Sequence, residues 1–186
     1  FKDDNGNDYP DWEEKRLREI CTNQPSNFQI QEQYLEIGDI DCGTKKYNVD
    51  NKKKIVNGAK QTFKGSILIS TVRPTRGAIT ILKESIYVSS ALAHIYIENE
   101  ICRQFVFQFL SQEKFFKILG LLATGSTYPT VNKADILGFK VPLPSLPEQQ
   151  KIANFLSLFD EKIETEKERL EHWKLLKKGF LQKMFI

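Results

Sequence analysis

Several residue types that carry chemistry are scarce in this chain of 186 residues. Its three cysteines, Cys21, Cys42 and Cys102, lie far apart and form no CxxC pair. No disulfide framework is therefore indicated, and a reducing, cytoplasmic compartment is expected. No uninterrupted apolar run approaches the roughly eighteen residues that a membrane helix needs, so the sequence predicts no contact with a membrane interior.

Histidine is equally scarce, and neither copy sits in a catalytic or metal-binding pattern. His94 falls inside an apolar alternating run, which favours a strand or core residue over a catalyst. His172 stands beside Trp173 in a helical pattern, which favours a solvated or interfacial position. Neither histidine has a cysteine or an acidic residue at metal-ligand spacing, so we expect no metal site.

Motifs of known catalytic families are also missing. The chain has no GxSxG, P-loop or GxGxxG sequence. Asp11 with Glu13 and Lys15 is a weak echo of the Asp…Glu-x-Lys pattern of metal-dependent nucleases, but these residues are crowded at the start of a predicted helix. Residues 127–130 do not match the Asn/Asp-Pro-Pro-aromatic loop of base-amino methyltransferases. We therefore expect a chain without catalytic residues or a cofactor.

The sequence opens on Phe1, its only methionine is Met184, and no secretory signal pattern is visible. Our expectation is that this is a piece of a longer polypeptide. Hydrophobic residues make up 40% and charged residues 27%, which are values typical of a globular protein. The composition thus excludes disorder and low complexity for the chain as a whole.

Charge is distributed unevenly along the chain. Residues 1–50 carry 6 Lys/Arg and 12 Asp/Glu, whereas residues 51–146 carry 13 and 5, a net charge of +8. Residues 147–186 are nearly balanced, with 8 and 7. The basic middle section is suited to attract a polyanion such as nucleic acid, although lysines that only solubilise a surface would give the same counts.

The first third of the chain is predicted to be mostly irregular. Residues 2–11 are turn-formers and indicate an exposed lead-in. Residues 12–20 predict a short helix that Asp11 caps, and the alternation over 34–40 predicts a strand. Residues 41–62 are polar and rich in lysine, which indicates a long surface loop with at most one short strand.

The centre of the chain is rich in short β-branched runs. Four strands are predicted, over residues 66–72, 78–82, 85–89 and 91–97. A proline-free run with apolar residues at three- and four-residue steps then predicts one helix over 98–123. A loop over 125–130 and a last strand over 136–143 complete a mixed α/β (α+β) fold class: a β-rich domain with flanking helices.

The last section predicts one long helix, from Glu148 to Met184. Ser145 and Glu148 have capping-box spacing, and Pro147 suits a first helical turn. Thirty-seven residues at 1.5 Å each give a rod of roughly 55 Å. We therefore divide the chain into a binding domain over 1–146 and a long helix over 147–186.

Apolar residues recur along this helix with a heptad pattern that favours antiparallel coiled-coil packing. The predicted interface residues are Ile152, Leu156, Phe159, Ile163, Leu170, Trp173 and Phe180. A narrow apolar seam on so long a rod cannot be buried by one compact domain, so it needs a second helix. The alternative is an ordinary helix that lies across its own domain.

Three segments offer groups that bind phosphates or bases. Residues 73–77 present two arginines and a threonine on a stiff turn, and arginine binds phosphate or guanine bidentately. Residues 125–130, followed by Lys133, offer hydroxyls, backbone N–H groups and one aromatic ring. The lysine-rich loop is the third segment. The candidate DNA-binding residues are Arg73, Thr75, Arg76, Ser126, Thr127, Tyr128, Thr130, Lys133, Lys45 and Lys46.

Four stretches in order give the chain a recognisable pattern: residues 34–40, 64–77, 123–133 and 141–152, the last running from a proline-rich segment into Glu-Gln-Gln-Lys-Ile and the long helix. This order and spacing resembles the specificity (S) subunit of type I restriction–modification enzymes. The resemblance runs from about Trp12 to the end of the chain, and the last stretch is its most specific part.

The resemblance implies a fold and a set of partners. Such subunits have two similar halves, each a target recognition domain followed by a long spacer helix, and the two helices pack antiparallel. Each domain reads one half of a bipartite sequence in double-stranded DNA. Methyltransferase (M) subunits dock alongside, and a restriction (R) subunit joins for cleavage. This chain matches one half, the C-terminal one, whose helix would pair with the N-terminal half of the same subunit or with a second copy.

The base-contacting residues of this family vary with the target, so the resemblance does not identify them here. Residues that match its shared pattern have structural or phosphate-positioning roles: Gly38, Asp39, Arg73, Pro74, Gly77, Gly125 and Ser126. Two other function classes remain open. One is a protein–protein adaptor with an incidental basic face, and the other is a divalent-ion nuclease, for which we expect no cleavage.

Overall fold

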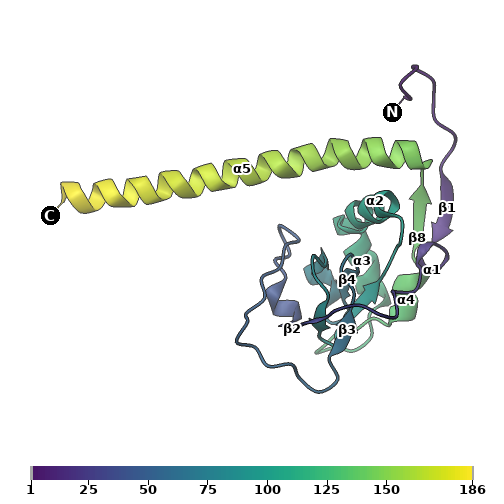
Figure 1. The fold of residues 1–186 in the computed structure, drawn as a ribbon, viewed down its shortest axis with the longest axis horizontal. Helices are drawn as coiled ribbons and strands as arrows, with labels where there is room; N and C mark the ends of the chain where they lie inside the picture. Colours follow the sequence, from purple (N-terminus) through teal and green to yellow (C-terminus); the bar gives the residue numbers. More distant parts are fainter. Residues whose placement is uncertain (1, 186) are drawn as a thin grey trace.

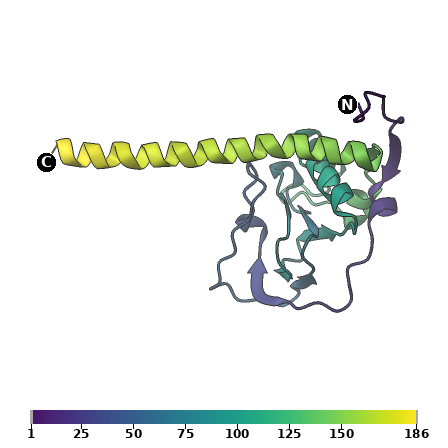
Figure 2. The same cartoon turned by 45° about the horizontal axis from the view of Figure 1, so that its top comes forward.

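The computed structural model describes residues 2–185 as a β-rich body beside one long helix, α5 (Leu146–Met184). The body lies along the first half of α5, and the second half extends beyond it, as both views show (Figures 1 and 2). The fold class is mixed α/β, as predicted, and the long helix begins two residues before the predicted start. In residues 2–185, no helix has the length and hydrophobicity that crossing a membrane requires.

Two three-stranded sheets form the centre of the body. The first has the order β2-β6-β3, with β2 parallel and β3 antiparallel to β6: Gln31–Leu35, Ile86–Val88 and Lys60–Thr62. The second is antiparallel with the order β5-β4-β7: Ile79–Ile81, Ile67–Ser70 and Leu92–Ile95. All four central strands fall within their predicted ranges.

Strand β4 is buried on both faces and joins two hydrophobic cores. Ile67 and Ile69 belong to a large core shared with the helices, whereas Leu68 belongs to a smaller core under β6. This alternation follows from the two-residue period of a strand. The body therefore needs no further layer to cover its central strand.

The predicted helix over residues 98–123 is two helices, α2 (Glu100–Leu110) and α3 (Glu113–Leu122). The single-helix prediction is wrong at Ser111 and Gln112. The Ser111 hydroxyl donates to the carbonyl of Phe107 at 2.8 Å, and Gln112 adopts an extended conformation that starts α3. A side chain that competes for backbone groups in this way favours a helix end, and the break lets both helices contribute phenylalanines to one core.

The predicted helix over residues 12–20 is wrong in its first half. Residues Glu13–Arg16 form strand β1, which pairs antiparallel with β8 (Lys140–Leu143), and only Leu17–Ile20 form helix α1. The partner strand lies at the other end of the domain sequence. A local pattern carries no information about such a partner, so tertiary pairing overrides the local preference.

Two predicted strands differ from their predicted ranges: β2 begins at Gln31, three residues before the predicted start, and both strands are shorter than expected. Strand β2 ends at Leu35, and a short 3-10 helix, η1 (Ile37–Asp39), follows because the Asp39 carboxylate accepts the backbone N–H of Glu36 at 2.9 Å. The start of the strand predicted over 136–143 belongs instead to helix α4 (Lys133–Gly138). In both places a side-chain acceptor three residues downstream caps a helical turn.

The start of α5 also differs from its prediction, because the expected Ser145–Glu148 capping box does not form. The Glu148 carboxylate is buried and instead accepts the indole N–H of Trp12 at 3.1 Å. Lys151 forms an ion pair with Asp4 at 2.6 Å, so the N-terminal lead-in lies along the first turns of α5. The chain thus enters the body close to the point where α5 leaves it (Figure 1).

Candidate nucleic-acid interface and exposed helix seam

The structure brings two of the predicted binding loops together. Val72 and Thr130 form an isolated antiparallel bridge, and the N–H of Arg73 donates to the carbonyl of Pro129 at 2.7 Å. The Arg73 guanidinium lies over the ring of Tyr128, with its central carbon 4.8 Å from the ring centroid. Residues 73–77 and 125–130, separate in the sequence, therefore form one continuous surface, which we call the paired loops.

The first of the paired loops is a rigid turn. Arg73 has a left-handed backbone (φ 47°), as has Gly77 (φ 76°), and the 3-10 helix η2 (Pro74–Arg76) lies between them. Thr75 packs its methyl group on α3, where a Cβ at Gly120 would lie 2.5 Å from it. Thr75 and Arg76 are exposed, so a fixed backbone presents a hydroxyl and a guanidinium to solvent.

The second of the paired loops is closed by two hydrogen bonds between the backbones of Thr124 and Thr130, at 2.9 and 2.8 Å. Gly125 turns the chain with φ 94°. Ser126 and Thr127 are exposed, and Tyr128 retains 64% of its accessible surface. A large exposed aromatic ring that an arginine covers on one side is suited to contact a sugar–phosphate backbone or a base.

Lys45 and Lys46 make contacts within the chain. The ammonium group of Lys45 donates to the carbonyls of Cys42 (2.5 Å) and Gly77 (2.9 Å), and burial lowers its pKa. Lys46 forms an ion pair with Glu164 of α5 at 2.7 Å. The lysine-rich loop therefore contacts the end of η2 and α5. Both lysines are less available to an external ligand than the exposed side chains of the paired loops.

Lys133 lies at the start of α4, a few residues beyond the paired loops. Partial burial, and secondarily the nearby Lys60, lower the pKa of its ammonium group. Among residues 2–185, Arg73, Arg76 and Lys133 form no ion pair with a carboxylate. Cations without an internal counterion are suited to bind an external anion.

Sequence reasoning did not identify Arg18, Lys60 and His94 as neighbours of Lys133. Arg18 and His94 line one cavity with it, and Lys60 lies near enough to both Lys133 and His94 to affect their pKa values. They come from α1, β3 and β7, which are distant in sequence. The clustering of lysines marked the region as basic, but no local pattern indicated that these particular residues converge.

Helix α5 carries its predicted seam largely in the open. Ile152 is half-buried against the body, whereas the remaining predicted seam residues are exposed: Leu156, Phe159, Ile163, Leu170, Trp173 and Phe180. The body contacts a different side of the helix, where Gln108 of α2 donates to the carbonyl of Ala153 at 3.3 Å. With 3.6 residues per turn, Ala153 lies about 120° around the axis from Phe159. The body of this chain thus leaves the seam uncovered.

The apolar surface of α5 is wider than the predicted seam. Phe155, Leu158, Leu176 and Leu181 are also exposed. Helical spacing places Phe155, Leu176 and Leu181 beside the heptad positions, at the edges of the same stripe, whereas Leu158 lies about 160° around the axis from Leu156 and outside the stripe. The heptad pattern singled out the centre of the stripe and missed its width, which exceeds the two positions per heptad of a simple two-helix contact.

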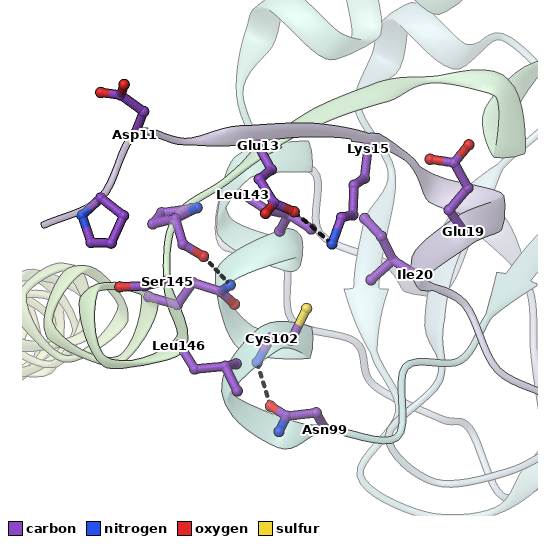
Figure 3. A pocket seen from close by; sticks show the side chains of 13 residues that line it. Asp11, Glu13, Lys15, Glu19, Ile20, Asn99, Cys102, Leu143, Ser145 and Leu146 are labelled. Carbon is purple, nitrogen blue, oxygen red and sulfur yellow. Dashed lines mark hydrogen bonds and ion pairs between the residues drawn. The ribbon is translucent and has the colours of Figure 1, made fainter.

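A pocket of about 490 Å³ lies where β1, α1 and α2 meet the start of α5. Figure 3 shows the carboxylates of Asp11, Glu13 and Glu19 along the N-terminal strand and helix, with the Glu13 carboxylate paired to Lys15 at 2.8 Å. Asp11, Glu13 and Lys15, which weakly resemble the pattern of metal-dependent nucleases, line this pocket. Within residues 2–185, no three His, Cys, Asp or Glu side chains are grouped so that they could hold a metal ion.

The fold and the paired loops together define a class of protein: a mixed α/β domain with an exposed basic and aromatic surface, joined to a long helix with an open apolar face. Comparison with known families refines this class. Residues 9–173 match the family described as "Type I restriction modification DNA specificity domain". The chain therefore belongs to this family of DNA target recognition domains. A specificity domain is a recognition unit without catalytic activity of its own, in agreement with the expectation from the sequence.

Individual relatives agree with this assignment. The chain is 27% identical to the type I restriction enzyme MjaVIII specificity subunit of Methanocaldococcus jannaschii, with 92% of this chain and 44% of that protein aligned. It thus spans less than half the length of that relative. Among solved structures, the HsdS subunit of Thermoanaerobacter tengcongensis has a similar fold, with a TM-score of 0.69 and 22% identity over 92% of this chain and 47% of that one.

A chain of a solved type I restriction–modification assembly gives a TM-score of 0.68 at 23% identity, over 96% of this chain and 51% of that one. At these identities the two structures establish a shared fold. In both comparisons the chain covers about half of the solved partner.

Proposed function

We propose that this chain reads one half of a bipartite DNA target through its paired loops, while α5 holds it at a fixed distance from a second reader. The body over residues 1–146 acts as the reader and the helix over 147–186 as the spacer. In this proposal the chain works in the cytoplasm, without a cofactor, as the C-terminal half of a specificity subunit.

The convergence of the paired loops is the observation that carries the DNA-reading part of the proposal. Two segments rich in hydroxyl and guanidinium groups meet at Arg73 and Tyr128, on rigid turns that no acidic partner neutralises. Arginine reads guanine bidentately in the major groove, and hydroxyls and backbone N–H groups position phosphates. A rigid surface of this composition matches what specific DNA recognition requires.

The uncovered stripe on α5 supports the spacer part. The second half of α5 extends beyond the body (Figure 1), and Leu170 and Trp173 are exposed, so burying them requires another polypeptide. We propose an antiparallel partner helix, from the N-terminal half of the same subunit or from a second copy of this chain. The N-terminal lead-in lies beside the first turns of α5. In this proposal the C-terminal end of an antiparallel partner helix would lie near the same turns.

The width of the stripe supports docking of methyltransferase subunits beside the helix pair. Residues at its edges, such as Leu176 and Leu181, would remain open after one antiparallel helix has covered the centre. In this proposal a restriction subunit then binds the assembled complex for cleavage. The adaptor alternative, with no DNA specificity, predicts the same helix contacts and no preference among duplexes.

Competition binding tests the proposal. The chain, purified with its methyltransferase subunits, is incubated with duplexes selected from a random library and with scrambled versions of the selected sequence. We expect preference for the selected sequence and binding that weakens steeply with salt. Equal binding to every duplex would contradict recognition and favour the adaptor. Incubation with DNA and magnesium alone tests the nuclease alternative, for which we expect intact DNA.

A further inference from the structure

A small cavity lined by Lys133, five residues after Tyr128 of the paired loops, has an unusual charge composition. Its volume is about 240 Å³, and it lies between α1, β7 and α4. Arg18 and Lys133 line it, His94 forms part of its wall, and none of its lining residues is acidic. We refer to it below as the basic cavity.

The cations of the basic cavity have no counterion in the described chain. Neither Arg18 nor Lys133 forms an ion pair within residues 2–185. Lys60 adds a third positive charge near the rim, and its ammonium group donates to the carbonyl of Ser90 at 3.5 Å. Like charges that face one cavity repel each other, and an anion placed between them would relieve that repulsion.

His94 forms part of the wall of the same cavity. Its Nδ1 is buried and has no hydrogen-bond partner in the part of the chain that the structure describes. Burial, together with Lys133 and Lys60, lowers the pKa of His94 to about 4, so the ring is neutral at pH 7. Because Nδ1 is buried, a ligand in the cavity does not reach this atom, and His94 contributes a neutral part of the wall while Arg18 and Lys133 carry the charge.

The basic cavity is connected to the paired loops by a short stretch of chain. Five residue steps separate Tyr128 from Lys133, which at about 3.4 Å each span at most ~17 Å. On duplex DNA this corresponds to about five base-pair steps of 3.4 Å. The backbone of Val131 between them is fixed by a hydrogen bond to Thr71 at 2.9 Å. Both places are therefore within reach of one half-site.

We infer that the basic cavity binds a phosphate group of the DNA backbone next to the bases that the paired loops read. The inference rests on the function proposed above and adds a contact site to it. Arg18 and Lys133 supply the positive charge, and His94 forms part of the wall. A non-bridging phosphate oxygen is small enough to enter the cavity. Contacts of this kind position the protein on the duplex and carry no sequence information.

Salt-dependent binding measures this contact directly. The chain assembled with its methyltransferase subunits is titrated with selected and scrambled duplexes over a range of potassium chloride concentrations. For Lys133→Gln and for Arg18→Gln we expect lower affinity on both duplexes alike. We expect the slope of log K against log salt to become shallower by about 0.9, which corresponds to one phosphate contact. Lys133→Arg keeps the charge and should retain the wild-type slope.

Lys117→Gln is the matched control, because Lys117 lies on α3 and is already paired with Glu113 at 2.9 Å. We expect it to leave affinity and slope unchanged. Wild-type slopes in both cavity variants, with DNA recognition intact, would overturn the inference and leave the proposed function standing. Loss of DNA binding in the wild type would instead overturn the proposed function.

Inorganic phosphate without DNA distinguishes a backbone phosphate from a free anion. If millimolar phosphate raises the melting temperature of the wild type but not of Lys133→Gln, while DNA slopes stay equal, the cavity takes a free anion and the DNA part of the inference is wrong. A neutral methylphosphonate at one backbone position should reproduce the Lys133→Gln slope, with no further change when the two are combined.

Discussion

The guanidinium of Arg73 covers one face of the Tyr128 ring, with 4.8 Å between the guanidinium carbon and the ring centroid. This contact joins the two loops that the sequence marked separately as binding segments. A cation held over an aromatic face is pre-organised, because neither side chain needs to be ordered when a ligand arrives.

Removal of the Tyr128 ring should weaken DNA binding. Tyr128→Ala deletes the exposed surface and releases the Arg73 guanidinium, so we expect affinity for the selected duplex to fall by roughly 1–2 kcal/mol. Tyr128→Phe keeps the ring and should retain most of the affinity. Equilibrium binding by fluorescence anisotropy compares the two, and equal losses would argue that the hydroxyl rather than the ring makes the contact.

Replacement of Arg76 by lysine should relax sequence preference. Arg76 is exposed on a rigid turn, and only a guanidinium has the fork that grips two acceptors of one guanine. We expect Arg76→Lys to lose about 1–3 kcal/mol on the selected duplex and much less on scrambled duplexes. A uniform loss on all duplexes would reassign Arg76 to a phosphate contact.

A charge in the centre of the α5 stripe should disrupt assembly. Leu170→Glu places a carboxylate where we propose that a partner helix packs, and burial of an unpaired charge is costly. Leu175→Glu is the matched control, since Leu175 is equally apolar, is exposed, and lies about 140° around the helix. Sedimentation velocity should show loss of the complex for the first variant alone. Assembly of both variants would contradict the proposed seam.

Acid should destabilise the body through His94. Its pKa in the folded chain is about 4, below the ordinary value of 6.5, so the unfolded chain binds the proton more readily. Stability is therefore lost as pH falls from 6.5 towards 4, by an amount we place at ~1–2 kcal/mol because His94 is partly exposed. Urea unfolding at several pH values should show this loss in His172→Gln and a smaller one in His94→Gln.

The indole of Trp12 should contribute to stability through Glu148. Trp12→Phe removes the N–H that this buried carboxylate accepts, and a lost hydrogen bond to a charged group costs roughly 1.5–3 kcal/mol. Trp173→Phe, on the exposed end of α5, is the control and should leave the free energy of unfolding nearly unchanged. Chemical denaturation monitored by circular dichroism measures both. If Trp12→Phe had the same free energy of unfolding as the wild type, solvent would be satisfying the Glu148 carboxylate.

The sequence was most informative where a pattern is local and repeated. The strands around Ile69 and Ile79 follow from short β-branched runs and the long helix through Leu170 from heptad spacing, and the structure has them where predicted. Strand β4 is buried at all four positions, which agrees with a continuous apolar run, the pattern of a strand covered on both faces.

Errors occurred where a distant partner decides the local structure. Glu13–Arg16 is a strand because β8 lies beside it, and the Glu148 carboxylate caps nothing because Trp12 binds it. Single side chains also ended elements early, as Ser111 does between α2 and α3. Neither kind of information is present in the periodicity of one segment.

The candidate site was predictable in its parts and not in its arrangement. Arg73 and Tyr128 stood out as residues with suitable chemistry, but their contact depends on the bridge between Val72 and Thr130. Lys45 stood out for its charge, and the structure turns it inwards to support Gly77. Whether a lysine faces solvent or braces a turn depends on packing that the composition of a loop does not encode.

The pairing of β1 with β8 has a consequence for how such a domain evolves. Both strands that connect the body to the rest of the chain lie side by side, next to the first turn of α5. The paired strands therefore hold together the two ends of the segment from Leu17 to Phe139. A different segment between the same two strands would attach to α5 in the same way. In the function proposed above, exchange of this segment would therefore change the DNA sequence that is read and leave the helix unchanged.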